Sequence, residues 1–240
     1  MRKKDDQLSL GLQVEQKKKI RWLTHTAIEG ALRCKRCFWL AYKQKIRQPE
    51  GIVSRLASRF DIVFKKYFDA YRGTNDLPPV IKDKIKGILQ FPFQERYYMR
   101  LNEKYGFYGK LDECIIENGK YVPVDFKTSS SDPREKESVL EAYQHQIDEY
   151  AYLMEHNKLS IAGYGYLIFF YPELSHQIHD GFPMVVHIQK IEAHIEGVKQ
   201  RIDRAIEILE DLFLTRLILA HFVCGIVQLN LSIHLFLNTY

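Results

Sequence analysis

FYGKLDECIIENGKYVPVDFKT, residues 107–128, is the stretch of sequence that decides the fold. Two runs rich in β-branched and aromatic residues flank Asn118-Gly119. Asn-Gly is the strongest short-range signal for a two-residue hairpin turn, because both turn residues adopt positive φ. The stretch therefore predicts an antiparallel hairpin in which Glu117 pairs with Lys120.

This turn also predicts which residues face each other farther along the hairpin. Counting back from the turn places Asp112 directly opposite Asp125, with Cβ atoms about 5 Å apart. Lys127 falls on the same face, while the apolar residues between them point the other way, into a core. Facing carboxylates repel each other, and a divalent cation such as Mg²⁺ would compensate them. A chance pair of surface aspartates beside a surface lysine is the alternative, although Asp is depleted in strands.

Working outward, the flanking segments predict a mixed α/β fold. Helical segments show apolar residues at three- and four-residue spacings, and strands are short and rich in β-branched and aromatic residues. Thr26 and Glu29 form the pattern of a capping box at the start of the first helix. The expected helices span 26–45, 55–72, 136–157 and 190–213, with partly helical structure over 81–105, and the expected strands span 107–117, 120–128, 163–171 and 183–189.

Composition excludes several classes of protein. A length of 240 residues is most simply one domain with appendages, and 46% hydrophobic residues can form a sizeable core. Four cysteines and a charged amino-terminal stretch without an apolar run predict neither a disulfide framework nor a signal peptide, and hence a cytoplasmic location. The net charge of +5 permits an anionic partner without demonstrating one.

Three motifs in order resemble the PD-(D/E)XK nuclease superfamily, in its RecB-like branch of stand-alone nucleases. They are Gly109-Lys-Leu-Asp112, Val124-Asp125-Phe126-Lys127-Thr128 and Gln146-Ile-Asp-Glu-Tyr150. Two earlier segments also resemble this branch, namely Cys34-Lys-Arg-Cys37-Phe-Trp-Leu40 and Phe68-Asp69-Ala-Tyr71-Arg72. The likeness covers about residues 24–212 and implies a restriction-endonuclease-like mixed β-sheet core flanked by helices.

The resemblance implies a metal-dependent deoxyribonuclease that hydrolyses phosphodiester bonds of single strands or strand ends. Asp112 and Asp125 would bind Mg²⁺ or Mn²⁺, with the backbone carbonyl of Phe126 as a further ligand. Lys127 would position or activate the attacking water, a role that suits its compact charge. The metal would supply Lewis acidity and a hydroxide. The alternative is a catalytically inactive nucleic-acid-binding module of the same fold, with or without a membrane tether.

Further site residues follow from the same resemblance. Gln146 and Tyr150 are four residues apart on one helix face and complete the implied catalytic set, although Tyr150 also fits core packing. Asp61 lies on the earlier helix where related nucleases place a metal-associated residue; an ordinary solvent-facing Asp is the alternative. The implied partners are DNA and a helicase or repair protein, with no small-molecule cofactor.

The cysteines depart from the family pattern. RecB-like members with an iron–sulfur cluster carry further cysteines near the carboxyl terminus, often as Cys-x-x-Cys, whereas only Cys224 lies there in this chain. An iron–sulfur cluster is therefore not expected, because a closed site normally needs four ligands. Cys34 and Cys37 are expected to pack in the core.

The two ends of the sequence differ from the predicted nuclease domain, 23–212. Residues 1–22 form a basic arm, either flexible or in contact with phosphates. Residues 213–240 are a hydrophobic tail that is atypical for the family, with no Asp, Glu, Lys or Arg after residue 216. The run 217–237 is long enough to span a bilayer, but its histidines and amides make a membrane location unexpected. A weak anchor, a helix packed on the domain and an end replaced by a change of reading frame are the alternatives.

Overall fold

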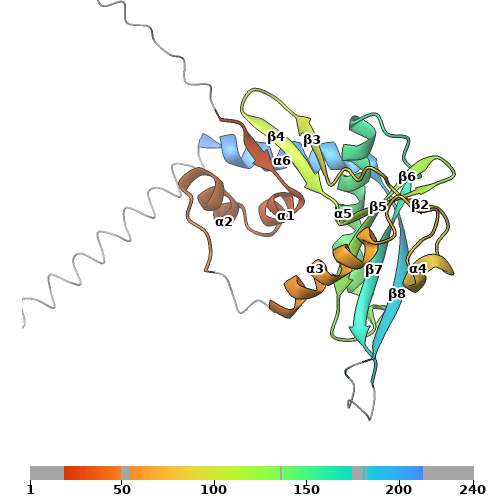
Figure 1. Cartoon of the computed structure of the whole chain (residues 1–240). Coiled ribbons are helices and arrows are strands. Elements are labelled where there is room, and N and C mark those ends of the chain that lie inside the picture. Colours follow the sequence, from red (N-terminus) through yellow and green to blue (C-terminus); the bar gives the residue numbers. More distant parts are fainter. Residues whose placement is uncertain (1–18, 50–54, 136, 175–180, 182, 213–240) are drawn as a thin grey trace, which may run out of the picture.

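The computed structural model describes residues 19–49, 55–135, 137–174, 181 and 183–212. These residues form a mixed α/β structure in which two sheets are flanked by helices (Figure 1). The helices are α1 (His25–Arg33), α2 (Lys35–Trp39), α3 (Arg55–Asp69), α4 (Pro79–Lys82), α5 (Glu137–His156) and α6 (Val198–Glu210). The strands are β1 (Arg21–Leu23), β2 (Ile88–Leu89), β3 (Arg96–Arg100), β4 (Tyr105–Lys110), β5 (Glu113–Glu117), β6 (Lys120–Thr128), β7 (Tyr164–Pro172) and β8 (Met184–Glu192).

The larger sheet has the strand order β2-β5-β6-β7-β8. Only β6 and β7 run parallel in this sheet, and the helix between them, α5, forms the crossover that parallel neighbours require. The smaller sheet has the order β1-β4-β3, with β1 parallel to β4. Arg21 and Trp22 therefore belong to a strand, so the predicted amino-terminal arm ends earlier than residue 22.

The hairpin turn forms as the sequence predicts. Glu117 pairs with Lys120, and the turn residues Asn118 and Gly119 have φ values of 49° and 75°. The ladder continues in this register to the pair of Glu113 and Val124 and then ends. The prediction that Asp112 pairs directly with Asp125 is therefore wrong in detail, because Asp112 lies one residue beyond the ladder.

The chain bends at Asp112 because the predicted strand 107–117 is in fact two strands. β4 ends at Lys110 and belongs to the smaller sheet, whereas β5 begins at Glu113 and belongs to the larger one. Leu111 and Asp112 thus connect the two sheets. The expected helical character of 81–105 is also wrong beyond α4, since β3 lies there and its residues alternate between exposed and buried.

The first helix also differs from its prediction. Its amino-terminal cap is Thr24, whose side chain accepts a hydrogen bond from the amide of Ala27, so no capping box forms at Thr26. The helix stops at Cys34, whose extended backbone starts α2, and a π-helical turn over Leu40–Gln44 follows. At the other end of the chain, β8 extends to Glu192, and α6 begins only at Val198 after a 3₁₀ turn (Ile195–Gly197).

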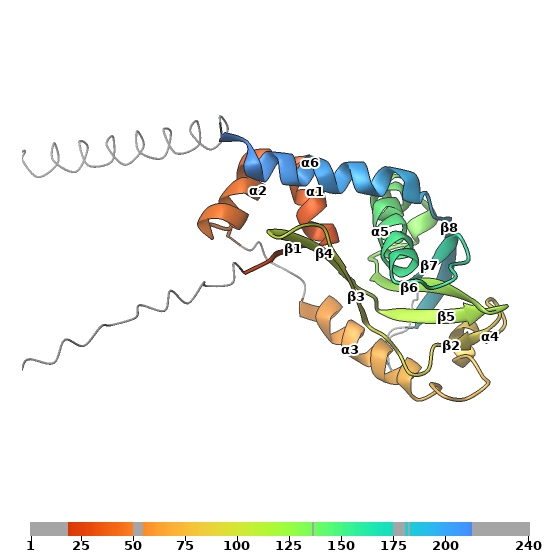
Figure 2. The same cartoon turned by 90° about the horizontal axis from the view of Figure 1, so that it is seen from above.

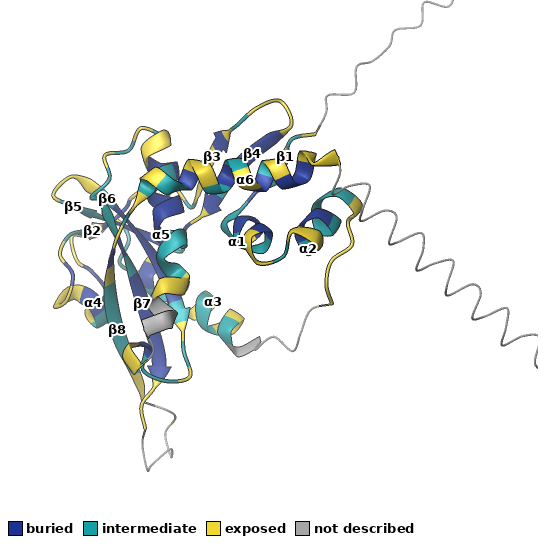
Figure 3. Cartoon of the chain, turned by 180° about the vertical axis from the view of Figure 1, so that it is seen from behind, coloured by how far each residue is buried: buried dark blue, intermediate teal, exposed yellow. Residues whose placement is uncertain are grey.

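Helices cover both faces of the larger sheet. Phe64 and Phe68 of α3 pack against Phe126 and Phe170 on one face, and α5 covers the other through Ile147. From above, α6 lies along α1, α2 and α5 (Figure 2). Most of β7 is coloured as buried in the view from behind (Figure 3). A strand that is covered on both faces must place any polar side chain in the interior.

Two predictions concern segments outside the described residues. The hydrophobic tail 213–240, with its possible span 217–237, is one of them, and most of the basic arm is the other. Within the ranges that the structure describes, no helix has both the length and the apolar character to cross a bilayer.

Candidate functional site

The candidate site lies where strand β6 passes against helix α5. Side chains alternate along β6, so that Phe126 enters the core under α3 while Asp125 and Lys127 face α5. Gln146 and Tyr150, one turn apart on α5, meet them from the helix side. The parallel crossover therefore brings the second and third sequence motifs into contact.

Asp125 lies at the centre of a hydrogen-bonded network. Its Oδ1 accepts a hydrogen bond from Nε2 of Gln146 at 2.9 Å and lies 3.2 Å from the Tyr150 hydroxyl. The Tyr150 hydroxyl has one proton, which is also within reach of the Lys110 carbonyl oxygen at 2.9 Å. The oxygen of the same hydroxyl accepts a hydrogen bond from Nε2 of Gln146 at 2.8 Å. The amide and the hydroxyl together fix the orientation of the carboxylate.

Lys127 places a positive charge beside this carboxylate. Its Nζ lies 2.5 Å from Oδ2 of Asp125 and donates a hydrogen bond to Oε1 of Gln146 at 2.8 Å. The ammonium also lies 4.4 Å from the ring centroid of Tyr143. A cavity of about 240 Å³ opens here between α3, β6 and α5, lined in part by Asp61, Lys127 and Tyr143. Among the described residues, Lys127 is the one basic side chain that lines this cavity.

Burial decides the electrostatics of Asp125. The residue is 3% exposed, and this burial raises the pKa of Asp125 to about 6. Lys127 opposes the rise and the charge of Asp112 adds to it. Oδ2 lies against the ammonium of Lys127 and has no further polar partner within the described chain. This buried oxygen therefore has lone pairs available for a further cation.

Tyr150 keeps its proton in this environment. Burial and the neighbouring charge of Asp125 raise the pKa of the Tyr150 hydroxyl well above its ordinary value. The hydroxyl is therefore a hydrogen-bond donor at neutral pH. Its ring packs in the core, as one interpretation of the sequence predicts, while its hydroxyl reaches the candidate site.

Asp112 reaches the site from the connection between β4 and β5. Its Oδ2 accepts a hydrogen bond from the backbone amide of Phe126 at 3.0 Å. Its Oδ1 lies 2.9 Å from Nζ of Lys65, a residue of α3. Asp112 is thus held beside Asp125 by the strand backbone and by α3 rather than by the ladder.

Lys65 is the residue of the candidate site that the sequence analysis missed. Its Nζ bridges two carboxylates, because it also lies 2.9 Å from Oδ1 of Asp61. The i, i+4 spacing of Asp61 and Lys65 would have revealed their ion pair. The contact of Lys65 with Asp112 depends on the tertiary fold, so no local pattern could have indicated it. Asp61 thus lies beside the site through Lys65, with its side chain 43% exposed.

The carboxylates fit Mg²⁺ or Mn²⁺ in an open site. Asp112 and Asp125 offer hard oxygen ligands, and Oδ2 of Asp125 is the buried acceptor without a hydrogen bond. Mg²⁺ commonly keeps several waters and is held by one or two carboxylates plus substrate phosphate. No group of three or more His, Cys, Asp and Glu side chains suited to a metal occurs in the described ranges. The set therefore fits such an ion only where water and phosphate complete its coordination, and only if Lys65 leaves Oδ1 of Asp112.

The cysteines lie elsewhere. Cys34 and Cys37 are half-exposed and line a separate, larger cavity beside α1 and α2, so the expectation that they pack in the core is wrong. Hydrogen bonds from Cys37 lower the pKa of the Cys34 thiol. Cys114 is buried in the core, and Cys224 lies outside the described residues.

Comparisons with known proteins add little to this geometry. No protein-family model matches the chain. No curated protein matches it either. Among solved structures, the one titled "Crystal structure of SSO0001" is similar to it, with 17% sequence identity and a TM-score of 0.46 over 81% of this chain and 79% of that one.

Proposed function

We propose that this chain is a metal-dependent nuclease that hydrolyses phosphodiester bonds of DNA, as a RecB-like member of the PD-(D/E)XK superfamily. The observation that carries the proposal is the meeting of three separate sequence motifs in one network. Asp112, Asp125 and Lys127 lie together with the Gln146–Tyr150 pair, although the motifs come from a connection, a strand and a helix. Hydrophobic residues can often replace a buried ion pair without loss of stability, so stability alone is a weak reason for Asp125 and Lys127 in a covered strand.

Each residue has a role in this proposal. Asp112 and Asp125 hold the divalent ion, which when bound supplies a Lewis acid and lowers the pKa of a water. Lys127 orients the attacking water and stabilises charge on the phosphate from the rim of the cavity. Gln146 fixes both Lys127 and Asp125, since its amide contacts both side chains. Tyr150 is a positioning residue that holds the Asp125 carboxylate.

A specific observation also favours the second candidate, an inactive nucleic-acid-binding module. The ammonium of Lys65 lies against Asp61 and Asp112, where it neutralises carboxylates that a nuclease would offer to a metal. In a binding module, this lysine and Lys127 would permanently replace the ion. A cytoplasmic location and recruitment by a helicase or repair protein belong to the proposed function in either form.

One experiment separates the two candidates. End-labelled single-stranded and double-stranded DNA are incubated with the full chain in Mg²⁺, Mn²⁺ or EDTA. We expect cleavage of single strands or ends that depends on the ion. Asp125→Asn should abolish it, because the neutral amide keeps the shape of the side chain but not its charge. Asp203→Asn, an exposed aspartate of α6, is the matched control and should cleave normally.

The outcomes are distinct. Ion-dependent cleavage that disappears only in Asp125→Asn supports the nuclease. Binding of DNA without cleavage under every ion supports the inactive module. Cleavage by Asp125→Asn at the rate of the unchanged chain contradicts the assignment of the site.

A further inference from the structure

We infer that the large cavity beside α1 and α2 is a binding site for single-stranded DNA that feeds the catalytic network. This inference rests on the proposed function and adds to it a separate site at which the chain holds its substrate. The cavity has a volume of about 820 Å³ and is separate from the catalytic cavity beside Lys127.

The charge of this cavity is of one sign. Among the residues that the structure describes, no aspartate or glutamate lines it, whereas five basic side chains do, all of them exposed: Lys19, Arg21, Arg33, Lys45 and Arg47. The whole chain has nearly balanced charges, with 35 basic and 30 acidic residues. The excess of basic side chains is therefore a property of this cavity and not of the chain as a whole. A concave surface with a single sign of charge attracts the opposite charge, here the phosphates of a nucleic-acid backbone.

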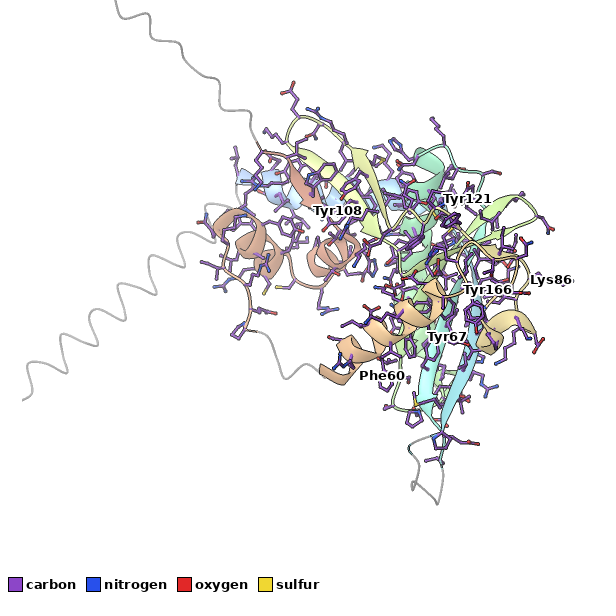
Figure 4. The ribbon with its side chains drawn as sticks, viewed as in Figure 1. Phe60, Tyr67, Lys86, Tyr108, Tyr121 and Tyr166 are labelled. Carbon is purple, nitrogen blue, oxygen red and sulfur yellow. The ribbon has the colours of Figure 1, made fainter. Side chains whose placement is uncertain are left out.

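Aromatic rings provide the second feature of the site. Trp22, Tyr42 and Tyr108 line the cavity among the basic residues. Trp22 and Tyr108 belong to a cluster in which Tyr98 stacks on Tyr108 at a centroid distance of 5.5 Å. In the view with side chains, Tyr108 lies beside α1, apart from Tyr67 and Phe60 on α3 and from Tyr166 on β7 (Figure 4). Basic grooves interleaved with aromatic side chains are typical of proteins that bind single strands, because bases stack on the rings.

The size of the cavity favours a single strand over a duplex. Its volume lies within the range of about 300–1,000 Å³ that is usual for pockets binding small ligands. A few nucleotides with unstacked bases fit such a space. In double-stranded DNA the bases are stacked on one another and are not free to stack on the aromatic rings of this cavity.

The walls of this cavity are attached to the catalytic helix. His145, next to Gln146 on α5, makes a 2.7 Å contact between its Nδ1 and Oε1 of Glu29 on α1. His25 of α1 makes a similar contact of 2.9 Å with Glu149 of α5. Helix α1, which supplies the Arg33 wall, is therefore held against α5 at two points.

Strand β4 provides the second connection between the two cavities. The carbonyl of Lys110 accepts a hydrogen bond from the Tyr150 hydroxyl. Tyr108 lies two residues before Lys110, so the backbones of these two residues are about 7 Å apart along the strand. The Tyr108 ring lies on the face of β4 that is turned away from α5, because its neighbour Gly109 faces Tyr150 and Leu153. Strand β4 therefore links the two sites through its backbone.

The test begins with binding in EDTA, so that cleavage does not interfere. Fluorescence anisotropy measures the affinity of the full chain for labelled single-stranded and double-stranded DNA, with inorganic phosphate as a competitor. We expect preference for the single strand and only weak competition by phosphate. Arg33→Glu and Arg47→Glu should each weaken binding and lower the slope of log K against log[salt] by about 0.7 for each lost phosphate contact. Tyr108→Leu should weaken it about fivefold through lost stacking.

Arg36→Glu is the matched control. Arg36 lies on α2 close to Arg33, but it does not line the cavity. Equal weakening by Arg33→Glu and Arg36→Glu would indicate diffuse attraction and overturn the inference. Circular dichroism confirms that each variant is folded.

A chemical measurement places the ligand independently. Cys34 and Cys37 line the cavity, so bound single-stranded DNA should slow their alkylation by N-ethylmaleimide at least several-fold. Mass spectrometry of the peptide that contains both cysteines measures the rate of alkylation. An unchanged rate of alkylation at saturating DNA contradicts the inference. A lack of alkylation in the absence of DNA also contradicts it, because the chain itself would then fill the cavity. Protection without cleavage supports the cavity and refutes the nuclease, whereas cleavage without protection does the reverse.

Discussion

At the scale of single residues, Asp125 combines two properties that rarely occur together. It is almost completely buried, yet it carries an oxygen that accepts no hydrogen bond from the described residues. Burial of a carboxylate favours its neutral form, and only Lys127 and the two donors of α5 oppose this. The residue is therefore kept at a cost to the stability of the metal-free chain.

This cost predicts a dependence of stability on pH. The pKa of Asp125 rises from 3.8 to about 6 on folding, so the folded chain binds this proton more tightly than the unfolded chain. Protonation of Asp125 therefore contributes at most about 3 kcal/mol to the free energy of unfolding below about pH 4. This contribution is lost as the pH rises through 6. We expect the free energy of unfolding of the metal-free chain, relative to that of Asp125→Asn, to fall between pH 4 and 6. Urea denaturation at several pH values measures this, and a constant difference would contradict it.

Lys65 leads to a second prediction at this scale. Its ammonium competes with a divalent ion for Oδ1 of Asp112. Lys65→Met should therefore strengthen Mn²⁺ binding about tenfold, because a full positive charge is removed within 3 Å of a ligand oxygen. Isothermal titration calorimetry without DNA measures the affinity. The exposed neighbour Lys66→Met is the control, and an equal effect in both variants would show that only net charge matters.

At the scale of elements, α5 is held in place by buried charges as well as by its apolar side. Nη2 of Arg201 on α6 lies 3.2 Å from Oδ2 of Asp148, and its Nε lies 3.8 Å from Oε1 of Glu149. The two carboxylate side chains are 3% and 1% exposed, so Arg201 is the cation that makes their burial tolerable.

Removal of this cation should destabilise the chain. Arg201→Gln leaves two buried carboxylates without their compensating charge, and we expect a loss of about 3 kcal/mol in the free energy of unfolding. Thermal and urea denaturation at pH 7 measure it. Arg204→Gln, on the same helix but more than half exposed, should change stability by less than about 0.5 kcal/mol. Similar losses in both variants would contradict the role of Arg201.

The elements also show how far the sequence leads. The register of β5 and β6 was predictable because Asn118-Gly119 is a local signal with one favoured geometry. The split of β4 from β5 was not, because it depends on a second sheet that β3 and β1 create from distant segments. The cap of α1 was misplaced by two residues, since Thr24 and Thr26 are both suitable caps and only the strand before Thr24 distinguishes them.

The candidate site follows the same rule. The hairpin and the motifs indicated Asp112, Asp125 and Lys127 together, and the family resemblance added Gln146 and Tyr150, whose spacing puts them on one helix face. Lys65 and the Lys110 carbonyl were missed, because both reach the site through tertiary contacts. Local spacing therefore indicates the residues on one element, and the fold supplies their partners.

At the scale of the whole molecule, Glu210 joins the end of α6 to the amino-terminal half. Its carboxylate accepts a hydrogen bond from the Tyr105 hydroxyl at 2.5 Å. The same carboxylate lies 3.3 Å from the ammonium groups of Lys43 and Lys104. The hydrogen bond from Tyr105, together with both lysines, lowers the pKa of Glu210 to about 2.

The sign of this shift is opposite to that of Asp125. A carboxylate with a lowered pKa stabilises the fold above its unfolded value near 4.5, and the contribution disappears as the pH falls toward 2. Glu210→Gln should therefore be less stable than the unchanged chain at pH 6, with a difference that shrinks on acidification. Because the side chain is 40% exposed, the difference should be modest. A difference that grows toward pH 2 would contradict the prediction.

The contact between α1 and α5 has a consequence for the order of folding. Lys127 and Gln146 are 19 residues apart in sequence, whereas His25 and Glu149 are 124 apart. Contacts of low sequence separation form sooner, because less chain entropy is lost when they close. On the ribosome, the first helix must wait for α5 to be synthesised before it can dock. The Asp125 network should thus assemble before the basic cavity, and the cavity should be the first region to open in native-state hydrogen exchange.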